Sequence, residues 1–217
     1  MPIRAYAFDA YGTLFDVHAA IGRHRGVIGK DADALSALWR VKQLEYSWIR
    51  TMMGRYKDFW TLTQEALDYA LARFPSVDPA IRKDLLDAYW RLEAYPDVAP
   101  ALTRLRRAGH AIAIFTNGTQ EMAEAAASAS AVLPLVDMVV SIEKMQQFKT
   151  VPAVYQNLCT RLDMQPDEVC LVSSNRWDIA GGVAFGLGSI WVNRTDMPDE
   201  YFDARPDKIV TSLAEIV

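Results

Sequence analysis

The sequence contains only two cysteines, which limits the redox and metal chemistry open to it. Cys159 and Cys170 lie in apolar surroundings, and their spacing does not match that of a metal-binding motif. We therefore predict that both are buried free thiols. A reducing cytoplasm is the simplest compartment for such a chain, and we expect it to be located there.

Long apolar runs and clusters of positive charge are also absent. No apolar run approaches the roughly 20 residues that a membrane-spanning helix requires, so no membrane span is expected. The 23 basic and 27 acidic residues are interspersed and give a net charge of −4, which leaves no basic stripe to bind nucleic acid. The apolar run that ends at Asp9 is too short for a signal peptide and lacks a small-residue cleavage site.

The chain does have enough apolar material for a sizeable core, since 51% of its 217 residues are hydrophobic. Short apolar runs of strand length alternate with stretches of helical character. The predicted strands are residues 3–8, 111–115, 138–142, 169–173 and 188–192. The predicted helices are residues 98–108, 120–130, 151–162 and 178–186. This alternation predicts an α/β fold with a Rossmann-like parallel sheet and helices on both of its faces.

The segment 16–95 departs from this alternation. It contains no convincing strand and carries apolar residues at helical spacing, which predicts four or five helices inserted after the first strand. We expect residues 1–15 and 96–217 to form the α/β core domain and residues 16–95 to form a helical cap domain. An insertion at the carboxyl end of a strand lies over the crevice where open α/β sheets bind ligands, so a cap is the economical interpretation.

The first predicted strand ends at Asp9, in the stretch Asp-Ala-Tyr-Gly-Thr-Leu-Phe-Asp. A carboxylate at the carboxyl end of a central strand stands where this architecture places its functional groups. Gly12 allows the loop to turn sharply, and Thr13 can hydrogen-bond a nearby carboxylate. Taken alone, an aspartate at a strand end is more often a turn or helix-cap residue. Its interpretation therefore depends on the residues at the ends of the other strands.

Three further polar stretches carry candidate site residues, and all of them lie beyond the second predicted strand. Thr116 and Asn117 open a predicted helix, where main-chain N–H groups make an anion site; an ordinary helix cap is the alternative. Lys149 precedes another helix and can neutralise a carboxylate or an anionic substrate, unless it is a solvated surface lysine. Residues 173–178 come after the fourth strand and can orient a water molecule, with helix capping again as the alternative.

In order and approximate spacing, these stretches resemble the four motifs of the haloacid dehalogenase superfamily, and the resemblance covers essentially the whole chain. The motifs are Asp9-x-Tyr11-Gly12-Thr13, Thr116-Asn117-Gly118, Lys149 and Ser173-Ser174-Asn175-x-x-Asp178. Within the superfamily the chain is most similar to the L-2-haloacid dehalogenases, whose first motif reads Asp-Ala-Tyr-Gly-Thr and whose last reads Ser-Ser-Asn-x-Trp-Asp. The stretch 39–46 also looks like the arginine-bearing cap helix of that subfamily.

Most members of the superfamily are Mg²⁺-dependent phosphatases, and the chain departs from them at two positions. Phosphatases carry an Asp two residues after the nucleophile, which acts as general acid and as a metal ligand through its backbone. They carry another Asp four residues before the last acid. These positions hold Tyr11 and Ser174 here. Mg²⁺ prefers charged oxygen ligands, and an alkoxide leaving group needs a general acid, whereas a halide leaves without a proton. The resemblance therefore implies a dehalogenase without metal or other cofactor.

The resemblance implies a two-step hydrolysis of short (S)-2-haloacids to (R)-2-hydroxy acids and halide. Asp9 would attack C2 from behind the carbon–halogen bond, forming an ester and inverting the centre. Water would then attack the carbonyl carbon of Asp9, positioned and activated by Asn175 and Asp178. The other catalytic residues that the resemblance implies are Thr13, Arg40, Lys149, Tyr155 and Ser173.

The same resemblance assigns the substrate contacts. Thr116 and Asn117 would hold the substrate carboxylate, and Arg40 would receive the departing halide with help from Asn117. The remaining substrate-binding residues would be Ala10, Tyr11, Leu44, Phe59 and Trp177. From the residues alone, Arg40 as a surface arginine and Leu44, Phe59 and Tyr155 as plain core residues remain the alternatives.

Two departures from the subfamily pattern affect the expected site. Thr116 stands where Ser is usual, which keeps the hydroxyl and adds a methyl group that can trim the pocket. Thr150 comes after Lys149 where Pro is common, which leaves the path of the lysine loop open. The other functions that the sequence permits are a Mg²⁺-dependent phosphatase and a non-catalytic ligand-binding protein of the same fold. If the chain is a dehalogenase, a fluoroacid is a further candidate substrate.

The helical segment is rich in aromatic side chains, which bears on the oligomeric state. Trp39, Trp48, Trp60, Tyr69 and Trp90 exceed what a small cap is expected to bury alone, so some of them are predicted to form an interface. The resemblance also implies a homodimer. The expected partners are therefore a second copy of the chain, the 2-haloacid substrate and the halide product.

Overall fold

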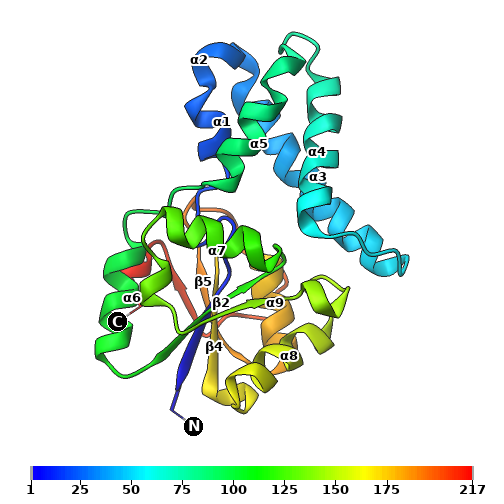
Figure 1. Cartoon of the computed structure of the whole chain (residues 1–217). Coiled ribbons are helices and arrows are strands. Elements are labelled where there is room, and N and C mark those ends of the chain that lie inside the picture. The colour runs from blue at the N-terminus through cyan, green and yellow to red at the C-terminus, as the bar shows by residue number, and fades with distance from the viewer. Residues whose placement is uncertain (1, 217) are drawn as a thin grey trace.

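A computed structural model describes residues 2–216 and contains a six-stranded parallel sheet (Figure 1). Its strands are β1 (Ala5–Phe8), β2 (Ala111–Thr116), β3 (Met138–Ser141), β4 (Val169–Ser173), β5 (Gly188–Val192) and β6 (Lys208–Val210). They are arranged in the order β3-β2-β1-β4-β5-β6, so that β1 lies between β2 and β4. The strand that leads to Asp9 is therefore central, and its carboxyl end lies beside those of β2 and β4.

Four helices cover the two faces of this sheet. They are α6 (Val98–Arg107), α7 (Gln120–Ala129), α8 (Pro152–Leu162) and α9 (Arg176–Phe185). Helices α6 and α7 lie against one face and α8 and α9 against the other (Figure 1). Every residue of β4 is buried, as the continuous apolar run of a strand covered on both faces requires. The predicted α/β class with a parallel sheet is confirmed.

Two local predictions were incomplete. The edge strand β6 was not predicted, because it is only three residues long and two of those residues are exposed. Helix α9 begins at Arg176 and not at Asp178. The polar stretch Ser173-Ser174-Asn175 looks like a loop, so the helix was predicted to start only at Asp178. In the structure Asn175 is the N-cap residue, and the helix starts directly after it. Asp178 consequently lies in the first helical turn.

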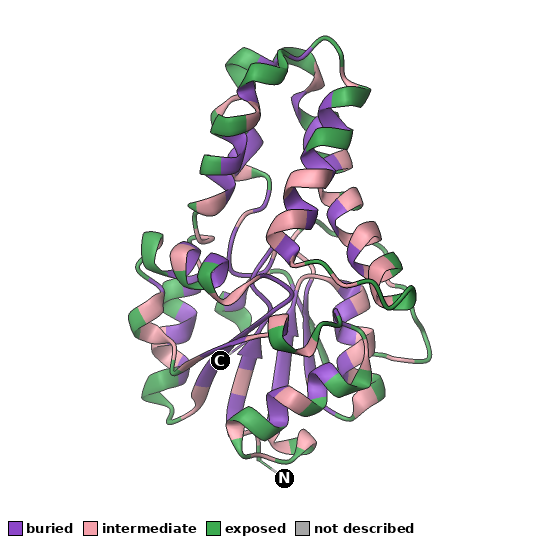
Figure 2. Ribbon diagram, turned by 45° about the vertical axis from the view of Figure 1, so that its right-hand side comes forward, coloured by how far each residue is buried: buried purple, intermediate pink, exposed green. Residues whose placement is uncertain are grey.

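Between β1 and α6 the chain forms five α-helices and, throughout residues 16–95, no strand longer than an isolated bridge. They are α1 (Ala19–Arg23), α2 (Arg25–Ile28), α3 (Ala32–Met52), α4 (Phe59–Arg73) and α5 (Arg82–Trp90). The helices stand beyond the end of the sheet, and their inward faces are buried (Figures 1 and 2). Asp58 starts α4 as an N-cap, since its Oδ1 accepts a hydrogen bond of 2.8 Å from the Thr61 amide. None of the helices within residues 2–216 is both long and apolar enough to cross a membrane.

Most of the aromatic side chains in this segment are used within the chain. Trp39 is 2% exposed, and its Nε1 donates to the carbonyl of Thr63 at 2.8 Å. The rings of Trp60 and Trp90 pack edge to face at 4.7 Å. The long helix α3 packs along α4 and so gives the segment its own apolar interior. Trp39 therefore does not supply the exposed interface that the composition led us to expect. Both cysteines are buried free thiols, as predicted.

Candidate active site

Asp9 lies immediately after β1, and its carboxylate is held by side chains from three separate segments. It is 5% exposed. Its Oδ2 accepts hydrogen bonds from Thr13 Oγ1 at 3.0 Å and from Asn175 Nδ2 at 2.8 Å. Its Oδ1 accepts one from Lys149 Nζ at 3.2 Å. Carboxylates in turns and helix caps accept hydrogen bonds from backbone N–H groups of their own loop. Asp9 is instead held by side chains, two of them from distant segments, which indicates a functional site and not a turn.

The loop after Asp9 folds back through Gly12, which has a φ of 92°. This left-handed conformation is accessible to glycine at little cost. The amides of Thr13, Leu14 and Phe15 all donate to the carbonyl of Ala10, at 3.3, 2.9 and 3.0 Å. The turn brings the Thr13 hydroxyl back to Asp9. Ala10 is fully buried, so the structure gives it a role in shaping the turn.

Lys149 is a buried cation shared by two carboxylates. It is 1% exposed, and its ammonium group donates to Asp9 Oδ1 at 3.2 Å, Asp178 Oδ2 at 2.8 Å and the carbonyl of Phe115 at 2.8 Å. All three N–H bonds thus have an acceptor, which a buried charge requires. The alternative of a solvated surface lysine is wrong. The Phe115 carbonyl was not predicted, because a main-chain acceptor leaves no signal in the sequence.

Asp178 is fully buried on α9, beside Lys149 and Tyr155. The Tyr155 hydroxyl donates to Asp178 Oδ1 at 3.0 Å. Burial raises the pKa of Asp178, and the charge of Asp9 adds to this effect, while Lys149 and the Tyr155 hydroxyl act to lower it. Burial and the nearby carboxylate also raise the pKa of Tyr155 well above its usual value, so this phenol stays a donor. Tyr155 is therefore a core residue by burial and a site residue by its hydroxyl.

Replacing Tyr155 with Phe is expected to shift the acid limb of the activity profile to higher pH. The hydroxyl stabilises ionised Asp178, so its loss raises the pKa of Asp178 further. If ionised Asp178 is needed for turnover, activity then begins to fail at a higher pH as the solution is acidified. The measurement is kcat/KM for halide release between pH 4.5 and 8 in both proteins. An unchanged acid limb would mean that the ionisation of Asp178 does not control the rate of turnover.

Asn175 occupies the residue before α9, yet its side chain forms no capping hydrogen bond with that helix. Its Nδ2 instead donates to Asp9 Oδ2 and, at 3.3 Å, to the carbonyl of Tyr11. The Ser173 hydroxyl accepts from the Asn175 amide at 3.1 Å and so orients the residue. The interpretation of Asn175 as an ordinary helix cap is therefore wrong, and the residue belongs to the site.

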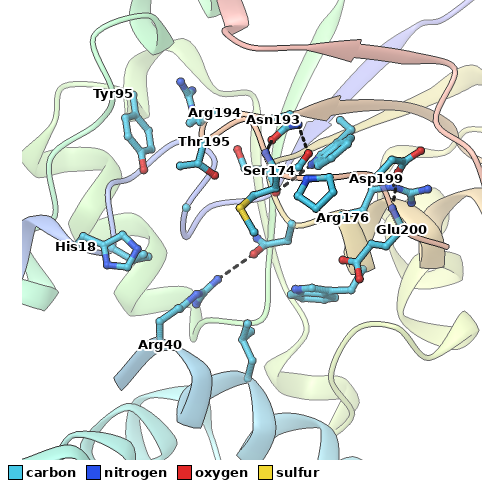
Figure 3. Close-up of a pocket in the computed structure, with 18 residues that line it drawn as sticks. His18, Arg40, Tyr95, Ser174, Arg176, Asn193, Arg194, Thr195, Asp199 and Glu200 are labelled. Carbon is cyan, nitrogen blue, oxygen red and sulfur yellow. Dashed lines mark hydrogen bonds and ion pairs between the residues drawn. The ribbon is translucent and has the colours of Figure 1, made fainter. Parts of the chain in front are cut away.

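Arg40 reaches the site from α3, in the helical segment that stands beyond the end of the sheet. Its Nη2 donates to the carbonyl of Tyr11 at 3.0 Å and to Asn175 Oδ1 at 3.3 Å (Figure 3). The side chain is partly buried and points from the helical segment toward the Asp9 loop. It is not a free surface arginine. Its guanidinium group thus places a positive charge beside Asn175, which itself contacts Asp9.

Thr116 and Asn117 lie at the end of β2 and do not cap the following helix. That task falls to Thr119, whose hydroxyl accepts from the Met122 amide at 3.2 Å. Asn117 Oδ1 accepts from the Lys149 amide at 3.0 Å, which orients the side chain with its NH₂ group away from this bond. Thr116 Oγ1 accepts from the Gly118 amide at 2.9 Å. Both side chains keep a hydrogen-bond donor that an anionic ligand can use.

An aromatic wall backs the site. Tyr11 stacks on Tyr89 with ring centroids 5.7 Å apart and an angle of 10° between the rings, and it lies 5.9 Å from Phe59. Phe59 is 1% exposed, so it supports Tyr11 from behind. A side chain at Gly118 would place its Cβ 2.6 Å from the Tyr11 ring, so glycine is required there. Tyr89 was not predicted, because it lies 78 residues from Tyr11 in the chain and carries no motif (89 − 11 = 78).

A cavity of about 430 Å³ opens beside these groups, between α3 and the segment after β5 (Figure 3). Arg40, Leu44 and Trp177 line it, as predicted for substrate contacts, and so does Asn175, which was predicted to be catalytic. The other predicted substrate contacts, Ala10, Tyr11, Phe59, Thr116 and Asn117, do not line it. The lining residues that the sequence did not indicate are Val17, His18, Tyr95, Arg176, Trp191 and seven residues between 193 and 200. The last seven follow the end of β5, and the others carry no signal of this kind.

The site does not fit a Mg²⁺ ion. The carbonyl of Tyr11, at the position where phosphatases use a backbone ligand, already accepts hydrogen bonds from Arg40 and Asn175. Lys149 occupies the space between Asp9 and Asp178 with a positive charge. Among the described residues, no group of three or more His, Cys, Asp or Glu side chains is placed to hold a metal. Cationic donors therefore occupy the positions that a metal ion would need.

Comparison with known proteins agrees with this geometry. The family model of the haloacid dehalogenase-like hydrolases matches residues 3–186. The chain is 48% identical to (S)-2-haloacid dehalogenase 1 of Pseudomonas sp. (strain CBS-3), over 99% of this chain and 95% of that protein. It is 46% identical to (S)-2-haloacid dehalogenase 4A of Burkholderia cepacia, over 99% and 93% of the two chains. A crystal structure of a dehalogenase with an intermediate complex is 45% identical, with a TM-score of 0.96 over 98% of this chain and 95% of that one.

Proposed function

The chain belongs to the haloacid dehalogenase-like hydrolases, and we propose that it hydrolyses short (S)-2-haloacids to (R)-2-hydroxy acids and halide. The observation that carries the proposal is the Asp9 carboxylate, which is nearly buried and held by Thr13, Asn175 and Lys149 with no acid at Tyr11. Such a carboxylate can displace a halide, which needs no proton, and is poorly equipped to expel an alkoxide.

In the first step Asp9 attacks C2 of the substrate, and the carbon–halogen bond breaks as the carbon–oxygen bond forms. Thr116 and Asn117 hold the substrate carboxylate through their free donors. The guanidinium of Arg40 stabilises the negative charge that develops on the halide. Tyr11, Leu44 and Trp177 limit the water around the reacting carbon; Phe59 acts behind Tyr11.

In the second step water attacks the carbonyl carbon of the Asp9 ester, and the bond between that carbon and the substrate oxygen breaks, so C2 is inverted only once. Asn175 and Asp178 position this water, and Asp178 accepts its proton and returns it to the leaving oxygen of the 2-hydroxy acid. The burial that raises the pKa of Asp178 makes it a better base than a surface carboxylate. Lys149 neutralises the carboxylates through both steps, while Ser173 and Tyr155 hold Asn175 and Asp178 in place.

A single turnover in ¹⁸O-water tests the nucleophile. Enzyme in excess over L-2-chloropropionate is expected to give lactate without ¹⁸O, because the new oxygen comes from Asp9. The label is then expected in the enzyme, in the peptide that contains Asp9. Labelled lactate from that first turnover would mean that water attacks C2 directly, which would overturn the role of Asp9.

The phosphatase alternative is tested by chelation. Halide release is expected to be unaffected by EDTA, because Lys149 and Arg40 supply the positive charge of the site. Hydrolysis of p-nitrophenyl phosphate that requires Mg²⁺ would favour the alternative and count against the dehalogenase.

Residues 16–95 are proposed to act as a cap domain on a core of residues 1–15 and 96–217. Arg40 and Leu44 support this proposal, since both come from α3 and line a cavity with residues of the α/β part. We further propose a cytoplasmic homodimer. Its support is the outer surface of α3 and the turn after it, where Val41, Ile49, Met52 and Met53 are 43–73% exposed. Sedimentation equilibrium, with Met52→Glu as the disrupting variant, tests the dimer.

A further inference from the structure

The outer wall of the cavity is formed by a segment without helix or strand, between β5 and β6. Residues 193–207 connect the two strands, and seven of them line the cavity: Asn193, Arg194, Thr195, Met197, Pro198, Asp199 and Glu200. The segment has few main-chain hydrogen bonds of its own, so its position depends on what the rest of the protein offers it.

Arg176 offers three hydrogen bonds to this segment. Its Nε donates to Asp199 Oδ1 at 2.7 Å, and its Nη2 donates to the carbonyls of Tyr201 at 3.1 Å and Ala204 at 3.0 Å. The side chain is 4% exposed although it is charged. Figure 3 shows the contact between Arg176 and Asp199 at the rim of the cavity. The hydrogen bond from Arg176 lowers the pKa of Asp199, which keeps this carboxylate ionised.

The geometry requires arginine. The guanidinium carbon lies 5.8 Å from the ring centroid of Trp191 and 5.7 Å from that of Tyr201, so the flat group lies between the end of β5 and the segment. A lysine ammonium is a point charge without the planar set of donors, so it cannot reach Asp199 and both carbonyls at once. None of the steps in the proposed mechanism uses Arg176, so these contacts need another explanation.

Arg176 also stands between two residues that face the site. Asn175 donates to Asp9, and Trp177 lines the cavity and packs edge to face on Trp48 of α3 at 5.4 Å. We propose that Arg176 and Asp199 form a clamp that fastens residues 193–204 as the outer wall of the substrate pocket. The clamp thereby sets the largest 2-haloacid that the enzyme accepts. The part concerning substrate size rests on the function proposed above.

Three variants test the clamp. Asp199→Asn removes the charge and weakens the bond to Arg176 while the carbonyl contacts remain. Arg176→Lys keeps the charge and loses the planar fork. Asp196→Asn is the matched control, because it removes the same charge from an exposed residue of the same segment that does not line the cavity and does not hydrogen-bond Arg176. Any effect on an anionic acid of removing one negative charge from the segment is therefore common to Asp199→Asn and Asp196→Asn.

The first readout is hydrogen exchange of peptides that cover residues 193–206. The Ala204 amide, which donates to the Tyr201 carbonyl at 2.9 Å, is expected to exchange about tenfold faster in Asp199→Asn and Arg176→Lys than in Asp196→Asn. Equal exchange in all three variants would overturn the clamp. This measurement needs no substrate, so it decides the clamp whatever reaction the enzyme performs.

The second readout is selectivity between L-2-bromohexanoate and L-2-bromopropionate, which share a leaving group and differ in length. The ratio of their kcat/KM values, hexanoate over propionate, is expected to rise about fivefold in Asp199→Asn and to stay within about twofold of wild type in Asp196→Asn. For bromopropionate, KM is expected to rise more than kcat falls. Faster exchange with an unchanged ratio would overturn the role in substrate size. If wild type releases no bromide, the proposed function fails and the size role fails with it.

Discussion

The Asp9→Asn variant is expected to release halide at least about 10⁴-fold more slowly than wild type, because the amide cannot form the ester intermediate. Asn has nearly the same shape as Asp, so the pocket is kept. The measurement is initial chloride or bromide release from L-2-chloropropionate or L-2-bromopropionate. The matched control is Asp33→Asn on the exposed surface of α3, which is expected to leave the rate unchanged.

The same variant is also expected to be somewhat less stable. The carboxylate of Asp9 accepts hydrogen bonds on both oxygens, from Thr13 and Asn175 on one and from Lys149 on the other. An amide NH₂ group on either side would face a donor, which leaves a buried donor without a partner and costs about 1–3 kcal/mol. Residual activity within a hundredfold of wild type, with an intact mass that excludes deamidation, would contradict the nucleophile assignment.

Replacing Lys149 with Met is expected to lower the activity at least about 10³-fold. It is also expected to lower the free energy of unfolding at pH 7.5 by about 3–5 kcal/mol. Met keeps the length and apolar stem of the side chain and removes the charge. The Asp9 and Asp178 carboxylates, with side chains 7% and 0% exposed, are then left without their shared cation. Urea unfolding followed by circular dichroism measures the loss.

The stability deficit of Lys149→Met is expected to shrink as the pH falls. Burial already raises the pKa of Asp178, and losing the lysine, which lowers it, raises it further. A carboxyl group whose pKa is higher in the folded than in the unfolded state stabilises the fold at low pH, and this contribution is lost as the pH rises through the folded value. The variant should therefore be closest to wild type near pH 5 and furthest above pH 7.5. A deficit that does not depend on pH would assign the loss to packing.

The surface control for this experiment is Lys83→Met. Lys83 pairs with Asp87 one helical turn away, and both side chains are more than half exposed, so solvent screens the pair. The control is expected to leave the unfolding free energy nearly unchanged at both pH values. A similar loss of unfolding free energy in both variants would mean that the burial of Lys149 does not increase the cost of removing its charge.

Local patterns were enough to predict the architecture. The continuous apolar runs that end at Asp9, Thr116 and Ser173 predicted parallel strands, because a strand covered on both faces must be apolar throughout. Since the carboxyl ends of parallel strands meet at the same edge of the sheet, the same runs predicted that these polar residues lie together. The edge strand β6 escaped prediction because it is three residues long and two of them are exposed, so it has no such run.

Through the resemblance that they carry, the order and spacing of the motifs predicted the chemistry as well, with Asp9 as the nucleophile and no acid at the positions of Tyr11 and Ser174. What only the tertiary structure decided is which atoms meet. It directed Asn175 to Asp9 and not to its own helix, joined Lys149 to the Phe115 carbonyl, and stacked Tyr89 on Tyr11. It also joined Arg176 to Asp199, Tyr201 and Ala204. These contacts join segments far apart in the chain, often through main-chain atoms that every residue carries, so no local pattern records them.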